Sequence, residues 1–367
     1  MIGILYEETI KEYDFGLGHS FRGDRYDIFP PFLKQHLAEG EVYQILKAIP
    51  ANDDDLSLIC QKDYIDFNKG FYEAANLGLS YPGNFLQFQS GDNKPNEKSG
   101  KIEIAARLII GQAKLACDLI QENKLQKVIS IGGGMHHAKP NSGEGFCIYN
   151  DVAFCAKYLQ QKYNLDRILI LDTDAHAGNG TAEYFYEDPK VLFVDLHQDP
   201  RTVYPGTGYS FDTGAGDGKG YTINIPLPVY AGKESYRLAF EEIIMPVVKE
   251  YKPQIIIRNG GSDPHVSDGL TALGLNVSGF KMIADTVREM SQICDGKVID
   301  LIGSGYNKNV LPYSWLALVS GVAGVDTALE EPEAIPPWLN VDRFLMEINI
   351  VINDVKKNLR DQWHCLR

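Results

Sequence analysis

The sequence predicts an α/β fold in which a mainly parallel central sheet carries helices on both faces. Short β-rich runs alternate along the chain with turns that contain glycine or aspartate and with helical stretches, a pattern typical of parallel sheets. Polar residues that can carry chemistry follow these runs, as expected where ligands bind beyond the carboxyl ends of the strands. No stretch resembles an interdomain linker, so we expect residues 1–367 to form a single domain.

Strands are expected where apolar residues cluster between turn signals. They are residues 1–6, 128–131, 168–171, 191–196, 221–225, 255–258 and 298–302. Helices are expected between them, mostly where apolar residues recur at helical spacing. They are residues 31–38, 64–75, 102–121, 151–163, 233–251 and 280–293, with a C-terminal helix at about 341–360.

Proline and glycine modify this pattern at three places. The pair Pro30–Pro31 indicates the start of the first helix. Pro246 should kink or split the helix at 233–251, because proline lacks the amide hydrogen that a helix interior needs. Residues 76–100 are rich in Gly, Pro, Asn and Ser and predict a long loop at the rim of the sheet.

Composition indicates an ordinary globular protein, with 44% hydrophobic and 23% charged residues. The six cysteines are scattered without a CxxC pair, which favours reduced thiols in the cytoplasm over a disulfide framework. The amino terminus does not resemble a signal peptide and no window is apolar enough to span a bilayer, so we expect no membrane partner. A net charge of −14 disfavours nucleic acid and is compatible with cationic substrates or with plain solubility.

The most informative segment is 167–180, where an apolar run leads directly into Asp172, Asp174 and His176. Side chains two residues apart on an extended chain leave the same face, so these three form a metal or charge cluster. The alternative is that an aspartate or Asn179 caps a helix that starts near Thr181. Burying unpaired carboxylates at a sheet end is costly without a counter-charge, which favours a metal site.

Five strand ends bring histidines, aspartates and a tyrosine to one rim. In chain order these residues are His136 and His137, the 172–176 cluster, His197 with 204–208, Asp263, and Tyr306. Taken alone, each has an ordinary alternative as a solvated loop residue, a core histidine or an aromatic at a strand end. A random scatter of eight histidines would seldom produce this arrangement.

Five segments of the chain form an ordered set of motifs. They are Gly132-Gly133-Gly134-Met135-His136-His137-Ala138, Gly145-Phe146-Cys147, Asp172-Thr173-Asp174-Ala175-His176, Tyr204-Pro205-Gly206-Thr207-Gly208 and Gly303-Ser304-Gly305-Tyr306. This set resembles the zinc-dependent histone deacetylase family, which includes bacterial acetoin-utilisation-type proteins and acetylpolyamine amidohydrolases. The resemblance runs from Tyr13-Asp14-Phe15-Gly16-Leu17-Gly18-His19 to the region of Trp315, and implies the arginase/deacetylase fold.

The resemblance implies that Asp174, His176 and Asp263 bind Zn²⁺. Two carboxylates and one neutral imidazole cancel the charge of the dication and leave a coordination position open, as a catalytic zinc site requires. The oxygen-rich ligand set makes Fe²⁺ or Co²⁺ conceivable as well.

The resemblance also implies the acid–base roles. His137 would take the proton from the attacking water, and Asp172 would hold the tautomer of His136. Tyr306 would donate a hydrogen bond to the developing oxyanion. Many family members carry a second Asp where this chain has Asn179, so His137 would lack a full negative partner and be less basic.

Six further residues are expected around the substrate. Phe146 and Tyr204 would form the walls of a narrow acyl-lysine channel, or else pack in the core. Gly145 belongs to the same motif as Phe146. Asp92 would grip the substrate backbone, or be a solvated loop carboxylate. Arg25 would lie near a product-release channel, or form a surface salt bridge. Leu270 holds the position at which polyamine-selective members place an acidic gatekeeper.

Two departures concern other sites. The resemblance implies a structural K⁺ or Na⁺ ion near Asp172. Asp195 stands next to this site at a position that is often Ser, and its extra carboxylate should tighten cation binding or change which ion is held. His265, two residues beyond Asp263, has no predicted role.

We therefore expect an amidohydrolase that acts on acyl-lysine in peptides or proteins. An acetylpolyamine or another small N-acyl amide is the alternative substrate, and a catalytically inactive binding module is the alternative function. The arginase-like ureohydrolases share the fold, but their two-manganese site needs carboxylates where this chain has Gly178 and His265. The sequence makes no prediction of the oligomeric state.

Overall fold

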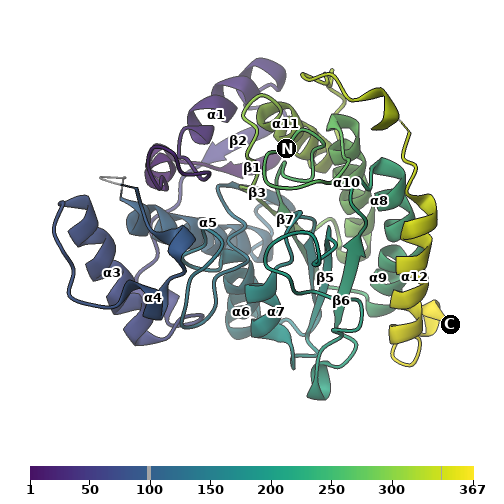
Figure 1. The fold of residues 1–367 in the computed structure, drawn as a ribbon, viewed down its shortest axis with the longest axis horizontal. Helices are drawn as coiled ribbons and strands as arrows, with labels where there is room; N and C mark the ends of the chain where they lie inside the picture. Colours follow the sequence, from purple (N-terminus) through teal and green to yellow (C-terminus); the bar gives the residue numbers. More distant parts are fainter. Residues whose placement is uncertain (97–100, 340) are drawn as a thin grey trace.

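The computed structural model describes residues 1–96, 101–339 and 341–367. Its strands form one eight-stranded sheet in the order β2-β1-β3-β8-β7-β4-β5-β6, and every pairing between neighbours is parallel (Figure 1). The strands are β1 (Ile2–Leu5), β2 (Tyr43–Leu46), β3 (Lys127–Ile131), β4 (Ile168–Asp172), β5 (Val191–Gln198), β6 (Thr222–Leu227), β7 (Ile255–Gly260) and β8 (Val298–Ile302). The predicted α/β fold class is confirmed, whereas the division into domains stays a prediction.

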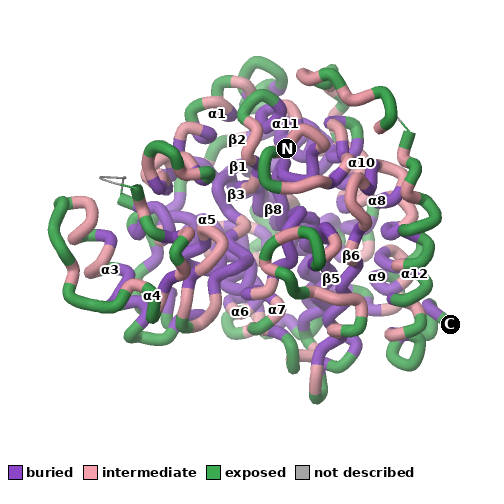
Figure 2. The backbone as a smooth tube through the Cα atoms, viewed as in Figure 1, coloured by how far each residue is buried: buried purple, intermediate pink, exposed green. Residues whose placement is uncertain are grey.

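Helices cover both faces of this sheet. The longer ones are α1 (Arg25–His36), α3 (Lys62–Asn76), α5 (Ile102–Gln121), α6 (Asp151–Tyr163), α10 (Val277–Met290), α11 (Leu311–Ala323) and α12 (Leu345–Leu359). Helices α1, α11 and α10 lie on one side, and α5 and α6 on the other (Figure 1). The central strands are therefore buried on both faces, as Figure 2 shows, and they read as continuous apolar runs.

Short helices occupy the connections. They are α2 (Asp53–Leu56), α4 (Phe85–Phe88), α7 (Asn179–Phe185), α8 (Lys233–Ala239) and α9 (Met245–Tyr251). A π-helical turn at Phe240–Ile244 separates α8 from α9, and Pro246 lies in the first turn of α9. The predicted split of this helix is confirmed. The rim loop at 76–100 includes α4 and a 3₁₀ turn at Gly91–Asn93, and its last four residues lie outside the described ranges.

The sequence prediction missed β2 and α11 for opposite reasons. Strand β2 lies at the edge of the sheet and buries only Tyr43, so its apolar signal is weak. Helix α11 is buried almost all round between its neighbours, so it has no polar face to reveal a helical period. Among the described residues, no helix is long and apolar enough to cross a membrane.

Helix α1 begins at Arg25 rather than at residue 31, and Pro30 and Pro31 lie inside it. Because proline has no amide hydrogen, Pro30 leaves the carbonyl of Tyr26 without its helical donor. The hydroxyl of Tyr6 donates to this carbonyl instead, at 3.1 Å. The prediction that the proline pair starts the helix was therefore wrong, since a side chain from outside α1 replaces the missing hydrogen bond.

We expect Tyr6→Phe to lower the free energy of unfolding by about 1–3 kcal/mol, because it leaves the buried Tyr26 carbonyl without a donor. Urea denaturation measures this change. In a Pro30→Ala background the same substitution should cost less, because the restored amide donates to Tyr26. Equal costs in the two backgrounds would contradict this explanation.

Candidate metal centre and active site

Asp174, His176 and Asp263 come together beyond the carboxyl ends of β4 and β7. Nδ1 of His176 lies 3.1 Å from Oδ1 of Asp174 and 3.0 Å from Oδ2 of Asp263. One ligand atom from each residue lies within 4.8 Å of the others, and all three residues are buried. The structure thus brings together the three residues predicted to bind metal.

This donor set fits a divalent cation. Carboxylate oxygens and imidazole nitrogens are both zinc ligands, and a catalytic zinc ion is held by three protein ligands with a further position open. Burial, reinforced by the carboxylate of Asp174, raises the pKa of Asp263 to about 8. A cation among these atoms would supply the counter-charge that the buried carboxylates need.

Neighbouring groups orient the ligands. The Ser304 hydroxyl donates to Oδ1 of Asp263 at 2.7 Å, and the indole N–H of Trp315 donates to the Ser304 carbonyl at 3.1 Å. The backbone N–H of His176 donates to Oδ1 of Asp174 at 2.9 Å. The sequence analysis assigned no role to Ser304, although its place between Gly303 and Gly305, two residues before Tyr306, was a usable signal.

The rings of His136 and His137 converge although the two residues are adjacent in sequence. Their Nε2 atoms lie 3.1 Å apart. The loop before them is held by Asp151, whose carboxylate accepts from the amides of Gly134 at 2.9 Å and Met135 at 2.7 Å. The sequence analysis treated Asp151 as an ordinary first residue of a helix and missed this function.

The carboxylate of Asp172 contacts His136, with 2.8 Å between Oδ2 and Nδ1. The amide of Asn259 donates to both oxygens of Asp172, at 3.0 and 2.9 Å. Burial opposes protonation of His136, but the carboxylates of Asp172 and Asp174 outweigh it and raise its pKa to about 9.

Asn179 is the partner of His137, with 2.7 Å between Oδ1 and Nδ1. Burial lowers the pKa of His137 well below its usual value, and the neighbouring His136 and His176 lower it further. The direction agrees with the weakly basic imidazole expected beside an amide partner.

A cavity of about 300 Å³ opens onto these groups. It is lined by Asp92, His137, Gly145, Phe146, His176, Thr202, Val203, Tyr204, Leu270 and Tyr306. The ring centroids of Phe146 and Tyr306 are 6.0 Å apart, and that of Tyr204 lies 5.2 Å from His137. All the predicted substrate residues except Arg25 line this one cavity.

Tyr306 lies on a loop that Asp268 ties to the loop of Leu270. The carboxylate of Asp268 accepts from the amide of Tyr306 at 2.8 Å and from that of Leu270 at 2.9 Å. Burial and the nearby Asp263 raise the pKa of Tyr306 well above its usual value. The phenol therefore keeps its proton and is available as a hydrogen-bond donor.

Asp92 and Arg25 are both held by backbone groups. The Asp92 carboxylate accepts from the amide of Gly145 at 2.9 Å and from the Ser90 hydroxyl, so it is not a freely solvated carboxylate. Arg25 is only 3% exposed, which makes the surface salt bridge alternative wrong. Its guanidinium donates to the Gly303 carbonyl at 2.9 Å and lies 5.4 Å from the ring of Tyr306.

Asp195 and His265, the two residues singled out above as departures from the family pattern, both have hydrogen-bond or ion-pair partners. One carboxylate oxygen of Asp195 accepts from the amide of Gly178 at 2.8 Å, and the other lies 2.9 Å from Nδ1 of His197. A potassium or sodium ion at Asp172 and Asp195 stays a prediction.

His265 accepts at Nδ1 from the amide of Ser267 at 3.0 Å. Its Nε2–H therefore donates to Glu331, at 2.9 Å. His265 ties the loop beyond Asp263 to the segment that precedes α12.

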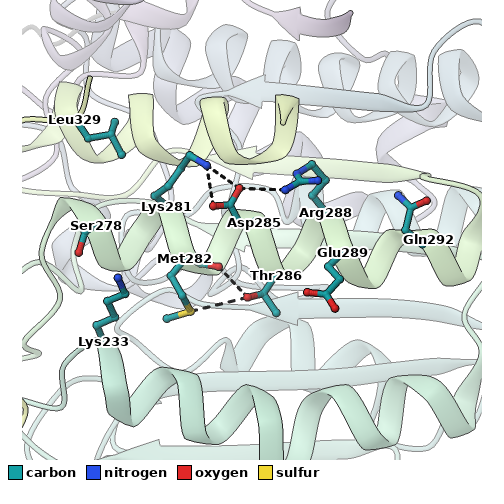
Figure 3. Close-up of a pocket in the computed structure, with 10 residues that line it drawn as sticks. All are labelled: Lys233, Ser278, Lys281, Met282, Asp285, Thr286, Arg288, Glu289, Gln292 and Leu329. Atoms are coloured by element: carbon teal, nitrogen blue, oxygen red, sulfur yellow. Dashed lines mark hydrogen bonds and ion pairs between the residues drawn. The ribbon is translucent and has the colours of Figure 1, made fainter. Parts of the chain in front are cut away.

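A second, more open depression of about 630 Å³ crosses the outer face of α10 (Figure 3). Its central charged groups are paired with one another, since Asp285 lies 2.7 Å from Lys281 and 3.5 Å from Arg288. It contains none of the predicted site residues, so the chemistry belongs to the cavity beside Asp263.

The chain is similar to known proteins in sequence and in fold. The histone deacetylase domain matches residues 19–322. A probable deacetylase of Archaeoglobus fulgidus is 35% identical, over 100% of this chain and 99% of that protein. The acetoin utilization protein AcuC of Staphylococcus aureus strain MSSA476 is 34% identical, over 92% of this chain and 85% of that protein.

The crystal structure of the HDA15 HD domain has the same fold, with a TM-score of 0.81 at 24% identity. The match covers 100% of this chain and 96% of that one. The family match and the sequence relatives identify the chain as a member of the histone deacetylase family and as a hydrolase that acts on acyl amides.

Proposed function

We propose that this protein is a zinc-dependent deacylase of acyl-lysine side chains in peptides or proteins. The observation that supports this most directly is one cavity lined by His137, His176 and Tyr306, in which His176 contacts the carboxylates of Asp174 and Asp263. Metal ligands, a base and an oxyanion donor therefore surround the space that an amide would occupy. The unpaired cysteines, five of them buried, support a cytoplasmic location.

In this proposal Asp174, His176 and Asp263 hold the ion. Zinc, or Fe²⁺ or Co²⁺ in its place, would act as a Lewis acid and lower the pKa of water to about 7. Because Nδ1 of His137 donates to Asn179, its Nε2 is the atom that accepts the proton of the attacking water. Asp172 keeps His136 oriented beside this base.

Tyr306 acts on the opposite side of the amide. Its protonated phenol donates to the oxygen on which negative charge develops as water attacks the carbonyl. Phe146 and Tyr204 grip the apolar stem of the acylated side chain, and Asp92 accepts from the substrate backbone. Arg25 lies behind Tyr306, on the route proposed for product release.

The proposal is tested by acetate release from an acetyl-lysine peptide. The protein should lose activity when all metal is removed by chelation and regain it when Zn²⁺ is added back. Hydrolysis that survives complete chelation would contradict the mechanism. Longer acyl-lysine peptides and N-acetylputrescine in the same assay define the acyl length and the substrate class.

Leu270 at the cavity mouth favours acyl-lysine over acetylpolyamines, since it offers no charge to a second ammonium group. Leu270→Glu should raise kcat/KM for N-acetylputrescine by about 1.4- to fivefold, because Leu270 is 41% exposed and a solvated ion pair contributes about 0.2–1 kcal/mol. Leu270→Gln is the uncharged control. Equal gains in both variants would show that charge is not the cause.

A further inference from the structure

A carboxylate outside the predicted site completes the hydrogen-bond chain behind His137. Asn179 contacts Nδ1 of His137 through Oδ1, at 2.7 Å, and its Nδ2 donates to Oε1 of Glu144. The same oxygen of Glu144 lies 3.2 Å from Nζ of Lys139. The chain thus runs from the imidazole through an amide to a carboxylate and then to a lysine.

The chemistry of the three partners fixes the orientation of the amide. A carboxylate can only accept hydrogen bonds, so Glu144 binds the –NH₂ end of Asn179 and not its oxygen. The oxygen is then left to face His137, where it accepts from Nδ1–H. We propose that Glu144 is a positioning residue: it holds the Asn179 amide in the orientation that keeps the proton of His137 on Nδ1 and leaves Nε2 unprotonated.

The backbone fixes both ends of this contact. Glu144 begins a turn closed by the Cys147 amide, in which Gly145 and Phe146 have φ of 59° and 65°. A Cβ at Gly145 would lie 2.3 Å from Cδ2 of His137, so only glycine allows this approach.

Gly180, which follows Asn179, approaches the backbone of His137. A Cβ there would lie 2.5 Å from the carbonyl carbon of His137. Helix α7 can therefore begin this close to the histidine loop, and Asn179 has little freedom to move away. The backbone therefore fixes how close Glu144 and Asn179 lie to each other.

This inference rests on the proposed role of His137 as the base. It implies that positions 144 and 179 need one carboxylate and one amide between them. The aspartate that many family members carry at the position of Asn179 would here put two carboxylates face to face. Asn179→Asp should therefore impair the enzyme, although it gives His137 a charged partner. An added Glu144→Gln should reverse the loss, because the new amide donates to the carboxylate at position 179.

The test is kcat and KM of the zinc-loaded protein on an acetyl-lysine peptide at neutral pH. Glu144→Ala should lower kcat about tenfold with KM changed less than about threefold, near the lower limit for removal of an outer hydrogen-bond partner. Glu144→Gln should stay within about threefold of the parent, because its Oε1 accepts the same hydrogen bond. Lys139→Ala, the matched control, removes the ion pair alone and should stay within about twofold.

The pair of Asn179 variants decides the proposal even if Glu144→Ala folds poorly. The double variant should exceed Asn179→Asp by about tenfold in kcat, which is a coupling that independent sites do not show. A double variant no faster than Asn179→Asp would overturn the proposal, as would parental kcat in Glu144→Ala. His137→Ala separates the two claims. Full activity in His137→Ala would overturn the proposed function. Loss of activity in His137→Ala, together with parental kcat in the Glu144 variants, would overturn only this inference.

Discussion

Replacement of Tyr306 with phenylalanine should lower kcat on an acetyl-lysine peptide by about 10²–10³-fold while zinc stays bound. The substitution removes only the phenolic hydroxyl, and one oxyanion donor contributes about 2.7–4 kcal/mol in comparable sites. The phenylalanine ring would keep its place beside Phe146, whose ring centroid lies 6.0 Å from that of Tyr306. The walls of the cavity should therefore stay as they are. KM should change little, because the lost hydrogen bond strengthens mainly as charge develops.

The measurement combines steady-state kinetics with the zinc content of the same preparation. Tyr186→Phe, at a tyrosine that does not line the cavity, is the matched control and should behave like the parent. If Tyr306→Phe turns over at the parental rate, the phenol is not the oxyanion donor. If the variant loses zinc as well as activity, Tyr306 supports the metal site instead.

Asp263→Ala should lose the metal itself, and with it all metal-dependent hydrolysis. Two ligands on one short segment, Asp174 and His176, would remain, and a structural or catalytic zinc ion needs at least three protein ligands. Elemental analysis after gel filtration measures the bound zinc. Asp217→Ala, in an exposed loop, is the control and should keep the parental stoichiometry. Stoichiometric zinc in Asp263→Ala would remove this residue from the ligand set.

The cluster of Asp174 and His176 was predictable because both residues directly follow an apolar strand. The alternation of Asp172, Asp174 and His176 after an apolar run is a local pattern, and β4 carries it to the edge of the sheet. Asp263 lies far away in sequence, and only the resemblance joined it to the other two. The structure supplies the physical reason: β7 is the neighbour of β4, and Asn259 is paired with Asp172.

Residues that act through side-chain contacts between distant loops were not predictable. Asp151 and Glu144 have no pattern of their own, since an acid in a first helical turn or in a glycine-rich loop is ordinary. Their roles depend on which loop faces them in the folded chain. The predicted start of α1 was wrong for the same reason, because Tyr6 donates to the Tyr26 carbonyl from another element.

Diffraction data collected at the zinc absorption edge from zinc-loaded crystals test the central claim most directly. We predict one anomalous peak at the carboxyl ends of β4 and β7, with oxygens of Asp174 and Asp263 and Nδ1 of His176 at about 2.0–2.2 Å. A stoichiometric ion found elsewhere in the molecule would contradict the account. So would an ion that lies at the cavity floor but beyond bonding distance of any of these three side chains.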